Sequence, residues 1–222
     1  KTWHSRCSVT QKVLKKMETR FAELISRILH PFYMPIYGLL ILYNSAFSTI
    51  FSGYEKITSL LILFLFTILF PALIILRFRK KRKISDFNIS NRKERFIPFL
   101  CVFCCYVLCA VVFIRFHLIP SFLSVFLLGS AVSILFLILI SFVWKISAHL
   151  TGIGGLCGTI FGTCLWLNIN TLNLFVLCVL LAGVLAYARI TLQQHSLAQT
   201  ISGFLLGFTC LFLSNLFFVW AK

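Results

Sequence analysis

The segment KISAHLTGIGG, residues 145–155, interrupts a long apolar stretch with a lysine, a serine and a histidine, and then continues into glycines. Ionisable groups are costly at membrane depth, so polar side chains in such a place are candidates for function. We expect Lys145, Ser147 and His149 to lie either at a helix mouth that faces water or in a polar pocket. Which of the two holds depends on the other polar groups that can reach them.

Composition places the whole chain in the membrane class. Of its 222 residues, 60% are hydrophobic, 16% are aromatic and 12% are charged, which is more apolar surface than a soluble domain of this size can bury. A bilayer core of ~30 Å takes about 20 helical residues to cross. The apolar runs therefore predict an all-α, polytopic membrane helix bundle of six to seven transmembrane helices. The runs lie at 24–50, 57–78, 96–116, 120–144, 146–168, 171–187 and 199–220.

The first residues have a different pattern from the spans. Apolar side chains recur at every fourth position from Val9 to Phe21, and lysines and arginines occupy the other faces. This predicts an amphipathic helix on the membrane surface, and a solvated basic leader without fixed structure is the alternative. We therefore divide the chain into a basic N-terminal segment, 1–23, and a single membrane-embedded domain, 24–222.

Nine cysteines do not indicate a disulfide framework here. Most recur at helical spacing inside apolar runs, where a thiol packs as a small apolar group. A metal site on the face from Cys101 to Cys109 is the alternative, but polar partners that would orient metal ligands are not nearby in the sequence. We expect no metal and no other cofactor.

Three polar clusters fall between the predicted spans, at 77–98, 145–149 and 188–195. An even number of crossings separates each cluster from the next, so all three reach the membrane face on which the chain begins. Together they supply arginines, whose planar forks suit phosphate oxygens, and a serine at a helix N-terminus, which favours an anion. Two histidines can divide the roles of nucleophile and general acid. The clusters therefore predict a phosphate site at the membrane surface.

These clusters resemble the signature of the type 2 phosphatidic acid phosphatases, the PAP2 superfamily, which reads K-x6-R-P, then P-S-G-H, then S-R-x5-H-x3-D. The second element corresponds to Ile146-Ser147-Ala148-His149. The third corresponds to Ala188-Arg189, then His195 and Gln199. The first is the loosest, with Arg95-Phe96 at the place of Arg-Pro, Asn88 at the place of the lysine and Arg92 as a substitute cation.

The resemblance implies a PAP2-like core and a metal-independent lipid phosphatase. His195 would attack phosphorus and form a phosphohistidine, and His149 would protonate the leaving alkoxide and then activate water. Four further residues would hold the phosphoryl oxygens, namely Arg92, Arg95, Arg189 and Ser147. The implied substrates are a phosphomonoester or diphosphate of a lipid, of the phosphatidate, phosphatidylglycerophosphate or polyprenyl diphosphate class.

Gln199 is the departure with the largest chemical consequence. Its amide oxygen can accept a hydrogen bond from His195 and orient the ring, but it supplies no negative charge. Asp86 or Glu94 would have to compensate across the pocket. The alternative function is a non-catalytic lipid-phosphate binding or transport protein on the same fold. Transferases that hold Mg²⁺ with clustered aspartates are excluded, because Asp86 is the only aspartate in the chain.

Two further patterns concern packing. Gly154, Gly158 and Gly162 form a small-xxx-small stripe that predicts close approach of the helix entered after His195. Pro31 and Pro35 predict a bend near the start of the first span. We interpret His30 and His117 as interfacial residues.

The charge distribution predicts the orientation. Lys and Arg outnumber Asp and Glu by 21 to 5, a net charge of +16, which favours contact with anionic membrane lipids over nucleic acid. Of the 21 basic residues, Lys56, Arg115 and Lys222 fall on the opposite face, which leaves about 18 on the face of the clusters. The positive-inside rule then places the site on the cytoplasmic face of a bacterial cytoplasmic membrane. The resemblance favours the periplasmic face as the alternative.

Overall fold

The computed structural model describes residues 2–44, 48, 51–82, 94–116, 121–167 and 170–220, with the side chains at 2–13, 121–122, 166–167 and 218–220 left undescribed. Within these residues the chain is all-α, and seven segments are long and apolar enough to cross a membrane. This confirms the prediction of a multi-pass membrane helix bundle. The segments are Leu14–Tyr43, Gly53–Lys80, Phe96–Phe116, Leu123–Ser141, Ala148–Leu165, Leu172–Thr191 and Leu197–Phe217.

The first span is bent where the prolines predict it. Helix α1 (Thr2–Ile28) ends before His30, a 3-10 turn η1 follows (Pro31–Tyr33), and α2 (Met34–Tyr43) completes the crossing. Proline has no N–H to continue a helix. The His30 side chain fills the gap, because its Nδ1 accepts a hydrogen bond from the backbone N–H of Phe32 at 3.4 Å.

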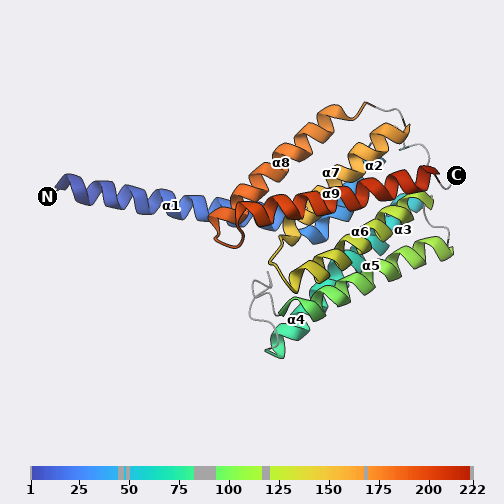
Figure 1. Ribbon diagram of the computed structural model, residues 1–222, viewed down its shortest axis with the longest axis horizontal. Coiled ribbons are helices and arrows are strands. Elements are labelled where there is room, and N and C mark those ends of the chain that lie inside the picture. The colour runs from blue at the N-terminus through green and yellow to red at the C-terminus, as the bar shows by residue number, and fades with distance from the viewer. Residues whose placement is uncertain are drawn as a thin grey trace.

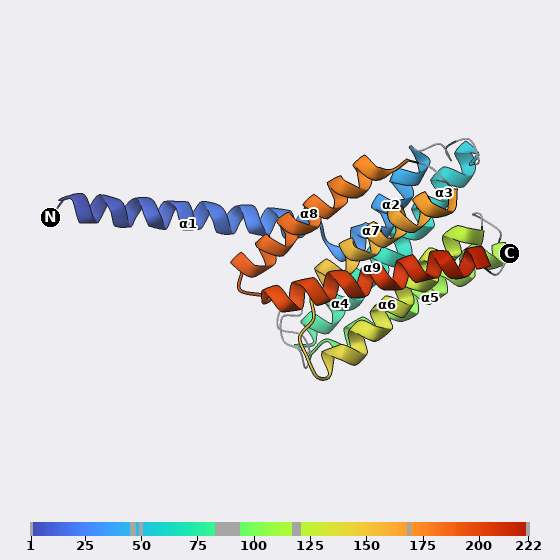
Figure 2. The same cartoon turned by 45° about the horizontal axis from the view of Figure 1, so that its top comes forward.

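Helix α1 extends well beyond the bundle, from the end at which α8 finishes and α9 begins (Figures 1 and 2). It passes residue 23 without a break, so the proposed division at that residue falls inside a continuous helix and stays a prediction. Its described half carries an exposed apolar stripe, comprising Leu14, Met17, Phe21, Leu24 and Ile28. The position of this helix on a membrane surface also stays a prediction.

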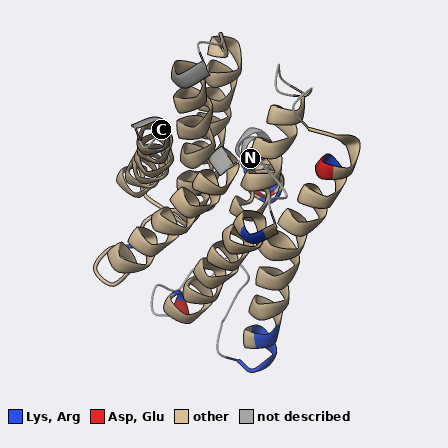
Figure 3. Ribbon diagram, turned by 90° about the vertical axis from the view of Figure 1, so that its right-hand side faces the viewer, with Lys and Arg blue, Asp and Glu red and all other residues tan. Residues whose placement is uncertain are grey.

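The second span is one long helix made of three parts, α3 (Gly53–Phe64), a π-helical turn η3 (Leu65–Leu69) and α4 (Phe70–Lys80). A capping box starts it, because Ser52 Oγ accepts from the N–H of Glu55 at 3.2 Å and Glu55 Oε2 accepts from the N–H of Ser52 at 2.7 Å. The π-helical turn precedes Pro71, which lacks an N–H for the regular ladder. Basic residues close α4, and Figure 3 shows the blue of Lys and Arg gathered at a helix end while most of the ribbon carries no charge.

Five helices complete the bundle, α5 (Phe96–Phe116), α6 (Ser121–Ser141), α7 (Ala148–Leu167), α8 (Leu172–Thr191) and α9 (Leu197–Trp220). Helix α6 packs between α5 and α9, α8 contacts both α1 and α7, and α7 and α9 make the most extensive contact (Figure 1).

Glycines explain the close contact between α7 and α9. A Cβ added to Gly154 or Gly158 would overlap the backbone oxygen of Phe204 or Phe208, and a Cβ on Gly207 would overlap the backbone oxygen of Thr151. Only glycine lets two helix backbones approach in this way. The predicted glycine stripe is therefore confirmed as the contact with the helix that follows His195.

The described cysteines lie in and around these helices as free thiols, in keeping with the packing role predicted from their spacing.

Candidate active site

The polar clusters from three separate loops meet at one end of the bundle. The backbone N–H of Ser147, just before α7, donates to the backbone oxygen of Gln199 near the start of α9 at 3.3 Å. Arg95, just before α5, donates from Nη1 to the backbone oxygen of Ile146 at 2.9 Å. The described parts of the three clusters therefore lie together, and their place at one membrane face stays a prediction. Arg92, which was predicted beside Arg95, lies outside the described residues.

The turn that carries His195 is shaped by the end of α8. The N–H of Gln194 donates to the oxygen of Arg189 at 3.1 Å and the N–H of Gln193 to that of Ile190 at 2.9 Å. This is the pattern of a Schellman cap, which needs one residue in the left-handed region. Gln193 takes that conformation with a φ of 54°, although glycine is usual there. The cap holds Arg189 and His195 close together, since the N–H of His195 also reaches the Arg189 oxygen at 3.4 Å.

Gln199 fixes the tautomer of His195. Its Oε1 lies 3.2 Å from the backbone N–H of Ser196 and 3.2 Å from Nδ1 of His195. A backbone N–H can only donate, so the amide atom at this point is the oxygen, and Nδ1 must be the protonated nitrogen of a neutral ring. Nε2 of His195 therefore keeps its lone pair. Ser196-x-x-Gln199 is a capping box at the start of α9, a pattern that the sequence contains and that explains a glutamine at this position.

The surroundings of His195 keep its ring neutral. Burial, together with the positive charges of Arg189, Arg95 and Lys145, lowers the pKa of His195 to about 3, and the hydrogen bond to Gln199 opposes part of this shift. The same cations make a positive field at the ring, which attracts an anion. Near neutral pH the site thus holds an uncharged imidazole beside cations.

Ser147 caps α7, as its place before the helix predicted. Its Oγ accepts from the N–H of Leu150 at 3.5 Å, and its backbone oxygen accepts from the Oγ1 of Thr151 at 3.0 Å. The start of α7 offers further N–H groups and the positive end of its dipole to an anion.

The predicted site residues are deeply buried, with exposed fractions of 2% for Arg95, 0% for Ser147, 5% for His149, 2% for Arg189 and 7% for His195. Arginine side chains such as Arg95 and Arg189 are rarely buried to this extent unless they are paired or functional. The guanidinium of Arg95 also lies over the ring of Phe99, at 5.8 Å from its centroid.

His30 is the site residue that sequence reasoning missed. Its ring makes an edge-to-face contact with the ring of His149, with centroids 5.1 Å apart, and the charge of Arg189 acts on both. His30 thus lies beside His149, and its interpretation as an interfacial residue stays a prediction. His117 lies outside the described residues, as does Asp86, the acid proposed to compensate for Gln199.

His149 presents a nitrogen that the protein does not satisfy. Within the described residues its Nε2 is buried and has no hydrogen-bond partner. A buried polar atom of this kind requires an explanation, such as a bound water or ion or a catalytic role.

The described part of the chain gathers no three His, Cys, Asp or Glu side chains that could hold a metal ion. No family model, curated protein or solved structure matches the chain. The chemistry of the site is therefore argued from its own residues, and membership of the PAP2 superfamily stays a prediction.

Proposed function

We propose that this protein is a lipid phosphatase that hydrolyses a phosphomonoester or diphosphate of a lipid through a phosphohistidine on His195. The observation that carries the proposal is the state of that ring. Gln199 holds its Nδ1–H, its Nε2 keeps a lone pair, and Arg95 and Arg189 add positive charge beside it. A neutral imidazole next to cations suits attack on an electron-rich phosphoryl group.

In the first step the lone pair of His195 Nε2 attacks phosphorus, and the bond between phosphorus and the ester oxygen breaks. The charge of the bound phosphate favours the protonated form of the neighbouring His149. His149 gives its proton to the leaving oxygen, so the lipid departs as an alcohol. Arg95, Arg189 and the start of α7 balance the charge on the phosphoryl oxygens.

In the second step His149, now neutral, removes a proton from a water molecule. The water oxygen attacks phosphorus, the phosphorus–nitrogen bond breaks, and its electron pair returns to His195 Nε2. Inorganic phosphate leaves, and both rings regain their starting states. The scheme assigns Gln199 to orientation, and the assignment of Arg92 to phosphate binding stays a prediction.

The location of the site follows from charge. We place it on the cytoplasmic face of a bacterial cytoplasmic membrane, because the basic residues lie mainly on this face. An odd number of crossings puts the C-terminus on the opposite face, so accessibility of a C-terminal tag in sealed vesicles tests the orientation.

Turnover separates the phosphatase from a binding or transport protein. Purified protein in EDTA is given phosphatidate, phosphatidylglycerophosphate and a polyprenyl diphosphate, and phosphate release is measured. We expect His195→Ala to lower the rate by at least about 10³-fold, as expected for loss of a nucleophile. His149→Ala should also lower the rate strongly, because it removes the acid of the first step and the base of the second.

The matched control is Gln194→Ala, one residue before His195 and outside the proposed chemistry. Phosphate release that persists in His195→Ala contradicts the mechanism. Tight binding of these lipids without release in the wild-type protein favours the binding or transport alternative.

A further inference from the structure

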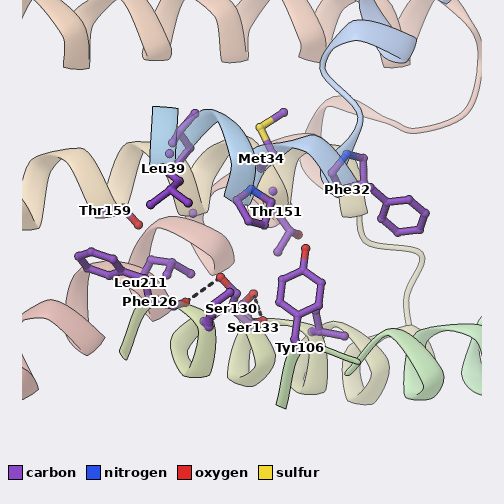
Figure 4. Close-up of a pocket in the computed structure, with 18 of the residues that line it drawn as sticks. Phe32, Met34, Leu39, Tyr106, Phe126, Ser130, Ser133, Thr151, Thr159 and Leu211 are labelled. Atoms are coloured by element: carbon purple, nitrogen blue, oxygen red, sulfur yellow. Dashed lines mark hydrogen bonds between the residues drawn. The ribbon is translucent and has the colours of Figure 1, made fainter. Parts of the chain in front are cut away.

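A cavity of about 250 Å³ lies inside the bundle, between α2 on one side and α5 and α6 on the other, with α7 along its length. Figure 4 shows Met34 and Leu39 on one wall, with Ser130 and Ser133 on the wall across from them. Tyr106 of α5 reaches into the space between these walls (Figure 4). Most of the lining is aliphatic or aromatic.

Three of the hydroxyl groups in the lining donate their hydrogen to backbone oxygens of the protein. Ser130 Oγ donates to the backbone oxygen of Phe126 at 2.8 Å, and Ser133 Oγ donates to that of Ser130 at 2.8 Å (Figure 4). Thr151 Oγ1 is likewise bonded to the backbone oxygen of Ser147. Each of these three hydroxyls has given its hydrogen to its own helix and has none left to donate to a ligand. The cavity therefore offers an apolar surface.

The cavity begins at the candidate active site. His30 and His149, whose rings touch, both belong to its lining. The buried, unsatisfied Nε2 of His149 thus belongs to a residue shared by the phosphate cluster and the apolar cavity.

The cavity extends deep into the membrane part of the bundle. Its lining on α7 runs from Ala148 to Thr163. At ~1.5 Å per residue this covers about 22 Å, against ~30 Å for the hydrocarbon core of a bilayer. Its volume is below the roughly 300–1,000 Å³ of sites for drug-sized ligands. A space this long and this small accommodates one narrow chain.

We infer that the cavity binds the hydrocarbon chain of a single-chain lipid phosphate, with the ester oxygen beside His149 and the chain directed along α7 toward Thr163. This deepens the proposed function and rests on it for the position of the phosphate. It selects, among the lipid phosphates considered above, those with one alkyl or isoprenoid chain over those with two acyl chains.

A residue on the cavity wall can be used to shorten the cavity. Thr159 lines it ten residues beyond His149, about 15 Å along the helix. Thr159→Phe should close the cavity at that depth. Leu165→Phe is the matched control, because this residue of the same helix is 57% exposed and is not in the lining.

The experiment measures binding and hydrolysis separately, with the whole protein in amphipol and butyl, octyl and dodecyl phosphate as probes. In wild-type protein the affinity should rise by up to about fourfold per methylene buried, until the chain fills the cavity. Thr159→Phe should lower the affinity for dodecyl phosphate at least tenfold and leave the affinity for butyl phosphate unchanged. Leu165→Phe should behave as wild type. Dodecyl phosphate should also bind more tightly than dioctanoyl phosphatidate.

The outcomes separate the two proposals. Hydrolysis with no dependence on chain length, or with equal effects of both phenylalanine variants, supports the phosphatase and overturns the cavity inference. If affinity rises with chain length up to a limit that Thr159→Phe shortens, and no phosphate is released, the cavity inference is supported and the phosphatase is overturned. Binding of dodecanol with the same chain dependence but of no phosphate overturns the placement of the phosphate at His149. A Thr159→Phe protein that does not fold is replaced by Thr159→Leu, for which the same direction is expected.

Discussion

The two faces of helix α7 are packed in opposite ways. Toward α9, Gly154 and Gly158 bring backbone against backbone, with no room for a methyl group. Toward α2, α5 and α6 the same helix borders a cavity, with Gly152 and Thr159 in its wall. The side of α7 toward α9 therefore fixes the position of this helix, and the opposite side leaves an open cavity.

This difference separates two requirements of the proposed reaction. Catalytic groups have to be held to within about 0.5 Å, and the close contact of α7 and α9 sets His149 relative to His195. A hydrocarbon chain requires only a matching space, because apolar contact has no preferred direction. The molecule meets both requirements with one helix.

The same glycine-to-alanine substitution, made at the contacts on the two sides of α7, gives the largest expected effect. Gly154→Ala and Gly207→Ala should each lower phosphate release by about 100-fold or more, because the added methyl meets backbone and forces α7 away from α9. Gly38→Ala, on the cavity side, should keep most activity, since its methyl would make an ordinary contact of 3.4 Å with Leu156 Cδ1. Phosphate release and thermal unfolding are measured for all three.

Gly183→Ala is the control for the effect of alanine itself, because nothing lies within 4 Å of the added methyl. Equal losses at Gly38 and Gly154 would show that the two faces are not packed differently.

A negative charge placed beside His195, at the start of α9, should raise the pKa of this histidine. Gln199→Glu keeps the length of the side chain and both of its hydrogen bonds, and should raise the pKa of His195 from about 3 by about 1–3 units, measured by NMR of the histidine nitrogens. In the wild-type protein the folded state binds this proton more weakly than the unfolded chain. Stability should therefore fall as the pH drops from about 6.5 toward 3.

The glutamate variant should lose stability over a narrower pH range, because its folded pKa is closer to that of the unfolded chain. His195→Gln removes this titration and serves as the reference for other groups. Identical pH profiles of unfolding in all three proteins would contradict the assignment of this pH dependence to His195.

The smallest effect concerns the turn that leads into α9. Gln193→Gly should stabilise the fold by about 1 kcal/mol, because the left-handed φ of 54° costs glycine little. The melting temperature should rise while phosphate release stays unchanged. Gln194→Gly is the control. An equal rise in its melting temperature would show that the gain at Gln193 does not come from relief of backbone strain.

The sequence predicted the spans well and the site in part. Long apolar runs require helices in a bilayer, and counting crossings placed Arg95, His149 and His195 on one face without any contact information. His30 was missed because its neighbours Pro31 and Pro35 indicate only a bend. No periodicity connects it to His149, which lies more than 100 residues away in the chain.

The amino-acid sequence alone determined the membrane class, the order of the helices, the glycine stripe on α7 and the face that carries the polar clusters. These follow from local periodicity and from the cost of polar groups in lipid. Only the tertiary structure decided that His30 meets His149 and that a cavity extends from the site. Each of these depends on how side chains from separate helices pack together, and residue spacing in the sequence does not predict that packing.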